Sequence, residues 1–581
     1  MKKHLYILIS VLFLTNFIYG QDATPTPTPS PTAVEKLENV PQIAPNFESD
    51  KKDLPDLGLV GVDMTQQKPL TLKEAITLAL ENNKDIEVTR QNVRIAEFDL
   101  QSLRGVYELR LSGQTFYERA TVPNTSIFST NRTTTTGNLG GNVALQGFIP
   151  KYGTILSGNF TNNRVASDNS ISILSPQYNS SLTLNITQPL FRGRNFDQNR
   201  RNIEISKRNL SLTDTQFRQR TIEVITNVQR AYWDLAFALR NLQVQRDGVR
   251  DAKEQLAHNK RLVEEGSLAP IDIVAAETQV AVIEQNVYEA LENVNRASNI
   301  LKNLISVNRN DSIWSESIVP TDSVELETPK TTLPEALELA LKNRPEIEVN
   351  ETQKEINSIE QRFYREQNKP QIDLIATYGS AGIGGSQNSN FRSPFSVTCN
   401  PQSVDYQTCL QQQQLQIQQQ QSFLQQIGGA GTTFTDILAN RYPTFRVGVQ
   451  FNLPLFGDKT SQAQLGKTLV QSDQIKTQRA QLEQSIQVDV RNALQSVRTA
   501  EARLRSAIIA RENTLKQYES EQRKLDAGQS DIYKVLERQT AYINARSNEL
   551  RAQTELNKAI ADLQRATGNS LKANNVEARL R

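Results

Sequence analysis

Residue types that carry most enzyme chemistry are scarce in this chain of 581 residues. It contains two cysteines, Cys399 and Cys409, and two histidines, His4 and His258. So few histidines argue against a histidine-based catalytic triad and a multi-histidine metal site. His258 lies in a polar helical pattern and is expected at the surface, and the glycines of "YGSAGIGGS" form no phosphate loop because no helical pattern follows them. We therefore expect no enzyme activity and no cofactor.

The N-terminus has the pattern of a secretory signal peptide, residues 1–20. Two lysines precede an apolar run, and Gly20 offers a small residue for cleavage. The mature chain is therefore expected outside the cytoplasm, where disulfides form. Cys399 and Cys409 lie ten residues apart in a polar segment, and the sequence leaves open whether they are joined.

Composition limits the possible partners. The chain has 65 basic and 63 acidic residues, so a nucleic-acid partner is not indicated. After the leader no apolar run reaches about 18 residues, so no transmembrane helix is expected, although alternating strands of about ten residues could still enter a membrane. Residues 21–68 open with "DATPTPTPSPT" and predict a Pro/Thr-rich disordered linker.

Long helices are the next predicted elements. Residues 197–265 lack proline and carry apolar residues at alternating steps of three and four, which predicts a coiled-coil helix about 100 Å long. A second helix follows to Val307. The same pair is predicted again, at 461–527 and in a last helix that ends near Gly568. The seam residues of the two long helices are Ile225, Val228, Tyr232, Leu235, Leu239 and Leu242, then Ile486, Val490, Ala493, Val497, Ala500, Leu504 and Ala507.

The chain is an internal duplication. "LKEAITLALENNKDIEV" from Leu72 returns as "LPEALELALKNRPEIEV" from Leu333, and later landmarks repeat at a nearly constant offset. The pairs are Leu72 with Leu333, Pro189 with Pro454, and Gly266 with Gly528, at offsets of 261, 265 and 262. We assign a first repeat to 69–310, a second to 330–570 and a C-terminal tail to 571–581.

Each repeat also contains alternating strand patterns between its short and long helices. Pro189 and Pro454 are expected to end strands where the wall turns into a helix, and Pro370 to open one, because proline donates no ladder hydrogen bond. The hairpin pattern around 142–160 has no counterpart in the second half; it could lengthen the strand wall, but an extracellular flap or an extended hairpin is favoured. The glutamine-rich segment that holds both cysteines is expected to be a loop.

Strands and helices of this kind are not stable in a single copy. A few strands leave open edges that lipid cannot satisfy, and long helices with narrow apolar seams cannot be buried within one chain. Both problems are solved if several copies close a shared strand wall and a shared helical tube. The fold class is therefore α+β, an internally duplicated protomer with long coiled-coil helices and strands for a shared barrel.

The ordered motifs resemble the TolC family of outer-membrane efflux proteins over about residues 68–570. They are the duplicated "LxEAxxLALxNxxxIEV", "KPQIDL", "QPLFRG" with "LPLFGD", and the turns "EEGSLAPIDIV" with "DAGQSDIYKVL". The resemblance implies a homotrimer in the Gram-negative outer membrane, with four strands per subunit in a twelve-stranded barrel and a periplasmic helical cylinder. It also implies outer-membrane lipid, a periplasmic adaptor and an inner-membrane pump as partners, in tripartite efflux or type I secretion.

The resemblance assigns a gate and adaptor-docking role to the two helix–helix turns, which begin at Gly266 and Gly528. Within them the gate carboxylate positions map to Asp272, Lys534 and Glu537, and a basic latch residue of the family maps to Ser530. A lysine ring beside a glutamate ring would nearly neutralise the constriction, whereas a solvated helix face is the alternative for these charges. The rival to a duct is a non-conducting coiled-coil envelope protein or adhesin.

Overall fold

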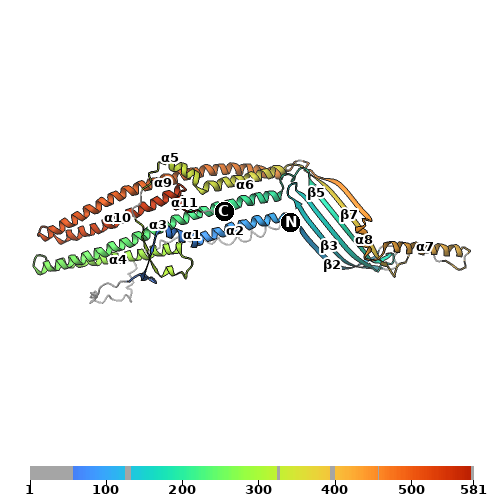
Figure 1. Ribbon diagram of the computed structural model, residues 1–581, viewed down its shortest axis with the longest axis horizontal. Coiled ribbons are helices and arrows are strands. Elements are labelled where there is room, and N and C mark those ends of the chain that lie inside the picture. Colours follow the sequence, from blue (N-terminus) through green and yellow to red (C-terminus); the bar gives the residue numbers. More distant parts are fainter. Residues whose placement is uncertain are drawn as a thin grey trace, which may run out of the picture. The chain divides into compact units, whose positions relative to one another are not determined.

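The computed structural model describes residues 57–577 apart from 125–131, 324–327, 393–398, 403 and 456. The elements below belong to one unit, Gly58–Arg581 (Figure 1). The predicted signal peptide, and the predicted linker as far as residue 56, lie outside the described residues. Within the described part of the chain, no helix has a stretch that is long and apolar enough to cross a membrane.

Two short helices begin each half, and their caps are written in the sequence. Thr71 and Glu74 form a capping box at the start of the first, and Asn83 caps the second. The helices are α1 (Leu72–Asn82) and α2 (Lys84–Arg104), and in the second half α5 (Leu333–Asn343) and α6 (Pro345–Gln367). The repetition of this pair is confirmed.

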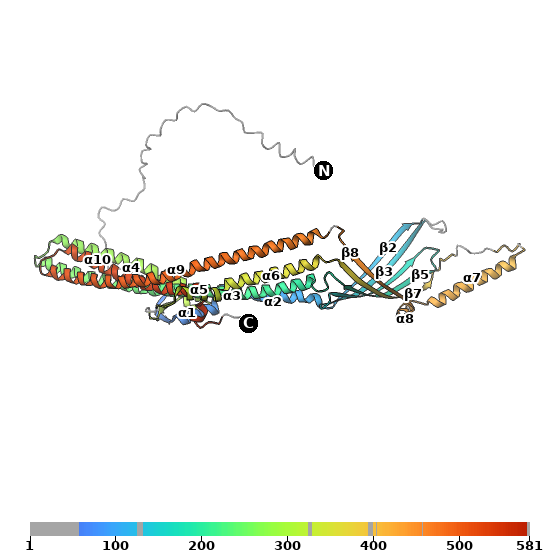
Figure 2. The ribbon, with the colours of Figure 1, turned by 90° about the horizontal axis from the view of Figure 1, so that it is seen from above.

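Four long helices form two hairpins. They are α3 (Gln198–Glu264) with α4 (Pro270–Ile305), and α9 (Lys459–Asp526) with α10 (Ile532–Ala566). Near the sheet the neighbours run α2–α3–α6–α9, and farther away they run α4–α3–α10–α9. The protomer thus presents four helices side by side at either level: Figure 1 shows them at the level far from the sheet, and Figure 2 shows those near the sheet.

The largest apolar core lies where α1, α3 and α4 meet. The α3 seam supplies fully buried Ile225, Val228 and Leu235, as predicted, and Trp233 beside them is 2% exposed. Burial on α3 extends beyond the predicted seam, because this helix contacts α1, α2, α4, α6 and α10. A helix packed on several sides needs a wider apolar surface than a two-stranded coiled coil.

Beside this core a parallel pair of strands joins the halves. Strand β1 (Asp63–Leu70) pairs with β6 (Glu316–Pro320). The predicted end of the linker, residue 68, is therefore too far along the chain. Its last residues, from Asp63, already pair with β6, a strand about 250 residues away. Tyr232 fastens the strand ends: its hydroxyl donates to Asp322 and contacts the Leu70 carbonyl oxygen at 3.0 Å.

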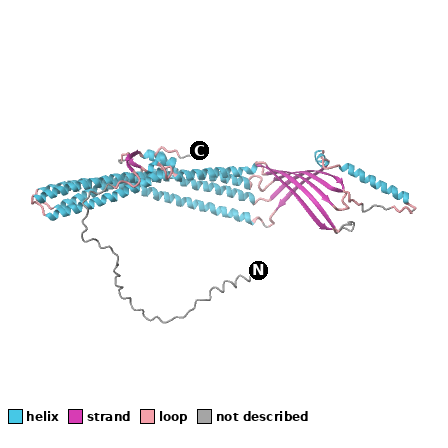
Figure 3. Cartoon of the chain, turned by 90° about the horizontal axis from the view of Figure 1, so that it is seen from below, coloured by secondary structure: helices cyan, strands magenta, loops and turns pink. Residues whose placement is uncertain are grey.

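Six strands form one antiparallel sheet in the order β2-β3-β4-β5-β7-β8. Figure 3 shows this sheet in magenta, next to the ends of the long helices. They are β2 (Arg110–Pro123), β3 (Thr133–Ile149), β4 (Thr154–Ser167), β5 (Leu174–Pro189), β7 (Gln371–Gln387) and β8 (Tyr442–Asn452). The unmatched hairpin is β3–β4, and both of its strands pair along their length with β2 and β5. It belongs to the sheet, so the extracellular flap is wrong, and the sheet of the described chain has six strands where the resemblance implied four per subunit.

The glutamine-rich segment, expected as a loop, is the helix α7 (Tyr406–Ile427), followed by α8 (Thr432–Leu438). Glutamine is a good helix former, and no glycine or proline interrupts α7 before Gly428, whose φ is 62°. A disulfide joins Cys399 to Cys409 at the start of α7. At the other end of the chain, α11 (Ser570–Ala573) occupies the beginning of the predicted tail.

Candidate functional site: the sheet faces and the helical turns

The sheet has one apolar face. Because partner residues of an antiparallel pair share a face, the register places one set of side chains together across all six strands. Many are large and exposed, including Phe445 at 76% and Leu111 at 73%. The face comprises Leu109, Leu111 and Tyr117, then Leu139, Val143 and Leu145, then Leu156 and Phe160, then Leu182, Leu184 and Ile186, then Leu374 and Tyr378, then Phe445, Val447, Val449 and Phe451.

The opposite face is polar. Its members are mostly serine, threonine, asparagine and glutamine, with Arg110, Glu118, Asp373 and Arg446 as charged exceptions. Typical members are Ser112, Gln114, Asn138, Asn142, Gln146, Ser157, Asn159, Thr161, Asn163, Ser181, Thr183, Asn185, Thr377, Thr444 and Gln450. A sheet apolar on one side and polar on the other can separate lipid from an aqueous lumen.

Both edges of this sheet are long. Within the described residues, β2 pairs only with β3, and β8 only with β7. Every neighbouring pair is antiparallel, so β2 and β8, at opposite ends of a six-strand order, run in opposite directions. The β8 edge of one copy is therefore oriented to continue the antiparallel ladder on the β2 edge of another.

The sheet joins the helices at the predicted prolines. Pro189 is the last residue of β5, Pro370 immediately precedes β7, and Pro454 follows β8 by two residues. The β3–β4 turn rests on the β5–α3 junction through Arg200, whose guanidinium donates to the carbonyl oxygens of Gly193 (2.7 Å) and Lys151 (3.4 Å). The turn of the inserted hairpin thus contacts the first turn of α3.

The turns between the long helices have one geometry. Gly266 and Gly528 have φ values of 73° and 68°, a region that favours glycine. Each chain reversal is closed by the same two bonds, from the glycine amide to the carbonyl three residues back and from the next amide to the carbonyl five residues back. These are the helix-ending motifs expected where a glycine follows the last helical turn.

The polar residues of these turns mainly hold the turns themselves. Asp272 accepts a hydrogen bond from the Ala269 amide at 3.1 Å, and Lys534 lies 3.3 Å from Asp531, which caps α10. The Ser530 hydroxyl donates to Glu521. Asp531 and Glu521 were not predicted, because nothing in their spacing distinguishes them from other exposed charges.

Two of these carboxylates have lowered pKa values. The Ser530 hydroxyl, followed by Lys524, lowers the pKa of Glu521 below its ordinary value. For Asp531 the backbone amide of Lys534 is the main cause of the lowered pKa. Hydrogen bonds that favour the charged form have this effect. Ser530, to which the resemblance assigns the latch position, therefore binds within its own hairpin.

An apolar groove lies between α4 and α10 just beyond the turns. It has a volume of about 480 Å³ and includes Ile271, Val274, Tyr533, Leu536 and Glu537. Ile271 and Tyr533 are 62% and 58% exposed. Glu537 thus lies at an apolar groove. His258, from α3, contacts Asp526 at 3.0 Å near the same turns and links the two hairpins.

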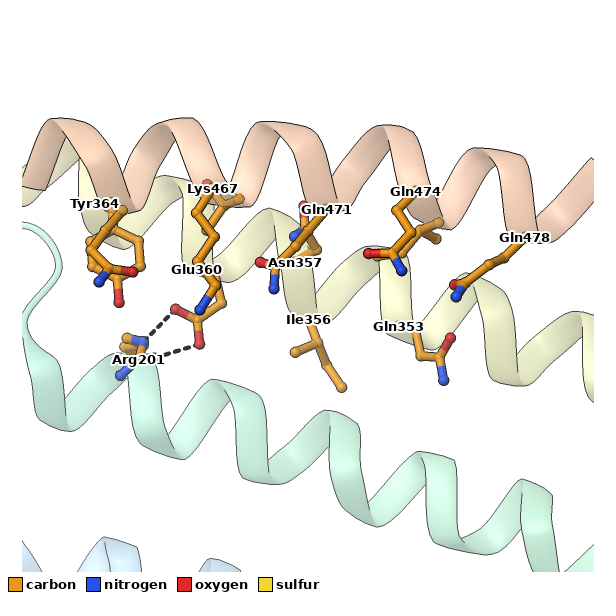
Figure 4. Close-up of a pocket in the computed structure, with 13 residues that line it drawn as sticks. Arg201, Gln353, Ile356, Asn357, Glu360, Tyr364, Lys467, Gln471, Gln474 and Gln478 are labelled. Atoms are coloured by element: carbon orange, nitrogen blue, oxygen red, sulfur yellow. Dashed lines mark hydrogen bonds and ion pairs between the residues drawn. The ribbon is translucent and has the colours of Figure 1, made fainter. Parts of the chain in front are cut away.

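A second groove, of about 550 Å³, lies among α3, α6 and α9 (Figure 4). The Arg201–Glu360 ion pair crosses one end, with the Arg201 Nε 2.9 Å from a Glu360 oxygen. Glutamines, asparagine and threonine supply most of its other polar groups. Among the described residues, no group of three His, Cys, Asp or Glu side chains could hold a metal ion.

The comparisons with known proteins agree with this architecture. The family model described as outer membrane efflux protein matches residues 75–306 and again 336–569. No curated protein sequence matches the chain. Solved structures with the same fold include CusC, for which transmembrane channel formation is described (14% identity, TM-score 0.59, covering 86% of this chain and 92% of that one). They also include the outer membrane channel CmeC of Campylobacter jejuni (16%, 0.58, 87% and 90%) and the outer membrane protein VceC of Vibrio cholerae (13%, 0.57, 86% and 96%).

The matched ranges cover most of the chain, and they follow the duplication read from its helices. The chain therefore belongs to the outer membrane efflux protein family, the TolC-type channels of the outer membrane, which are not enzymes.

Proposed function

We propose that this protein is the passive exit duct of an export system, formed by three copies. The two-faced sheet with complementary open edges carries the proposal. Three sheets joined β8 to β2 close a barrel of eighteen strands, apolar outside and polar inside, in the outer membrane. The four helices that each copy presents at either level continue it as a periplasmic tube of twelve.

The duct does no chemistry and needs a driven partner. We propose that an inner-membrane pump supplies the substrate and that a periplasmic adaptor docks at the helical turns. The α4–α10 groove supports this docking, because exposed Ile271 and Tyr533 beside Glu537 are suited to an amphipathic helical hairpin. Tripartite efflux and type I secretion would share this exit part.

Single-channel conductance separates the duct from its rival, a non-conducting envelope protein or adhesin. The purified full-length protein, reconstituted in planar bilayers, is expected to assemble as trimers and to show discrete openings. The two hairpins of helices that meet at glycine turns favour a gated duct, since an adhesin stalk would carry one continuous heptad run. A pure trimer that never conducts would overturn the proposal.

The turns Gly266–Asp272 and Gly528–Glu537 are proposed as the gate. A ring of three Lys534 side chains would repel cations there, so Lys534→Asp is expected to increase block by multivalent cations added from the periplasmic side. Lys476→Asp is the matched control, because Lys476, on α9, is also an exposed lysine paired with an aspartate three residues away, Asp473. Equal block in both variants would mean that Lys534 does not face the lumen.

A further inference from the structure

The apolar face of the sheet carries two charged residues among its described strand positions, and both are arginines. Arg119 is on β2 and Arg164 is on β4. Their partners on the intervening strand are Gly137 and Leu139, two residues apart, which puts both arginines on the apolar face. The four charged residues of the polar face, in contrast, include both signs.

Both arginines lie toward the same end of the sheet. Strands β2 and β4 run away from the helices, and each arginine comes near the end of its strand. At about 4.8 Å per strand and 3.3 Å per residue, their Cα atoms are about 12 Å apart. Two long side chains at that distance can contact two phosphates of one headgroup.

Neither arginine is paired with another residue of the described chain. Among the described residues, none forms an ion pair or side-chain hydrogen bond with Arg119 or Arg164, whereas Arg441, at the same end of the sheet, pairs with Asp436 at 3.0 Å. Tyr178 is the β5 partner of Arg164. The Tyr117 side chain lies over Gly137, the β3 partner of Arg119. Tyrosine beside arginine is typical of the boundary between apolar lipid and charged headgroups.

The apolar surface continues next to the arginines. Helix α8 covers the same face, where Phe434 stacks on Phe160 with ring centroids 5.8 Å apart and the Ser180 hydroxyl donates to the Thr433 hydroxyl. Phe434 and Leu438 remain 46% and 86% exposed. The arginines therefore lie at the border of an apolar surface. A lipid, which has both an anionic headgroup and apolar chains, fits this arrangement better than a soluble anion does.

We propose that Arg119 and Arg164 form a site for the phosphorylated headgroup of an outer-leaflet lipid, at the end of the sheet farthest from the long helices α3 and α9. The site rests on the proposed function, since it needs the apolar face in lipid and this end outward. The charge of the site matches a headgroup with two phosphates, and guanidinium groups bind phosphate through two parallel bonds.

The test uses the full-length protein in detergent and three lipids: bis-phosphorylated lipid A, its monophosphoryl form and phosphatidylcholine. Thermal unfolding is followed while each lipid is added. We expect the strongest stabilisation from the bis-phosphorylated form, and an affinity about fivefold weaker for each of Arg119→Gln and Arg164→Gln. Arg446→Gln, on the polar face, is the matched control and should bind like the wild type.

The outcomes separate this proposal from the duct itself. Equal stabilisation of the wild type by all three lipids would overturn the site, and this comparison needs no variant that folds. Equal affinity in the wild type and in the doubly substituted protein would also overturn it, while a conducting channel in the same preparation leaves the duct intact. A protein that neither inserts into bilayers nor conducts would instead contradict the proposed function.

Discussion

A single arginine on either side of one strand tests which face of the sheet meets lipid. Leu184 and Thr183 are neighbours on β5, and their partners on β4 are Gly158 and Asn159. Leu184 is on the apolar face, where its side chain is 46% exposed in the single chain, and Thr183 is on the polar face. Leu184→Arg and Thr183→Arg therefore place the same side chain on opposite faces of one strand, at nearly the same depth.

The size of the effect follows from depth. Leu184 is five residues from Pro189 and six from Tyr178, and a strand tilted by about 40° rises about 2.5 Å per residue. With Pro189 and Tyr178 as the two boundaries of the apolar band, Leu184 is about 13 Å from the first and about 15 Å from the second. An arginine at the bilayer midplane costs about 2–4 kcal/mol, a factor of about 30 to 900 in the folding equilibrium. Thr183→Arg is expected within about 0.5 kcal/mol of wild type.

The assay is folding into phosphatidylcholine vesicles, titrated with urea at fixed protein concentration and followed by circular dichroism and protease protection. Leu184→Arg should lower the urea midpoint strongly, and Thr183→Arg should fold normally but change the conductance of the open channel. Equal midpoints for the two variants would refute the assignment of the faces. A larger loss from Thr183→Arg would mean that the polar face meets the lipid.

Three further predictions concern single groups. Tyr232→Phe removes a buried hydroxyl that contacts the β1 and β6 ends, and should destabilise the protein by about 1–3 kcal/mol, with faster amide exchange in both strands. Because the pKa of Glu521 is lowered in the fold, its stabilisation is present above about pH 4.3 and lost as the pH falls through the folded value; Ser530→Ala should therefore lower the melting temperature at pH 6, with a difference that shrinks toward pH 3. Cys399→Ser removes the disulfide to Cys409, ten residues away, and with it about 3 kcal/mol of local stability. The variant should show faster proteolysis of α7 with unchanged conductance.

The repeated helices were predictable because their signal is local. The seam positions Ile486, Val490 and Val497 are buried, and the long helices begin and end within about two residues of the expected positions. Heptad spacing and a terminating glycine are properties of residues close together in the sequence, so they predict a helix and its end without knowledge of the partner helix. The same holds for the turns at Gly266 and Gly528.

Elements that depend on distant partners were missed. Strand β1 has a polar sequence with a proline at position 69, and it is ordered only by pairing with β6. The β3–β4 hairpin was recognised, but its place could not be, since glycine-rich strands fit a flap as well as a wall. The polar partners at the turns, such as Glu521 for Ser530, depend on how the chain reverses direction.

The inserted hairpin fits a requirement set by the helices. Four helices side by side at 8–10 Å occupy about 32–40 Å of circumference per copy. Strands 4.8 Å apart and tilted by about 40° occupy about 6.3 Å each, so four strands would cover about 25 Å and six cover about 38 Å. Six strands therefore let the wall continue the tube at nearly constant width. The hairpin lies between β2, which follows α2, and β5, which precedes α3, and its turn contacts Arg200 through the Lys151 carbonyl oxygen. The hairpin thus adds two strands between the strand that follows α2 and the strand that precedes α3. Its deletion should narrow the sheet without changing the order of the helices.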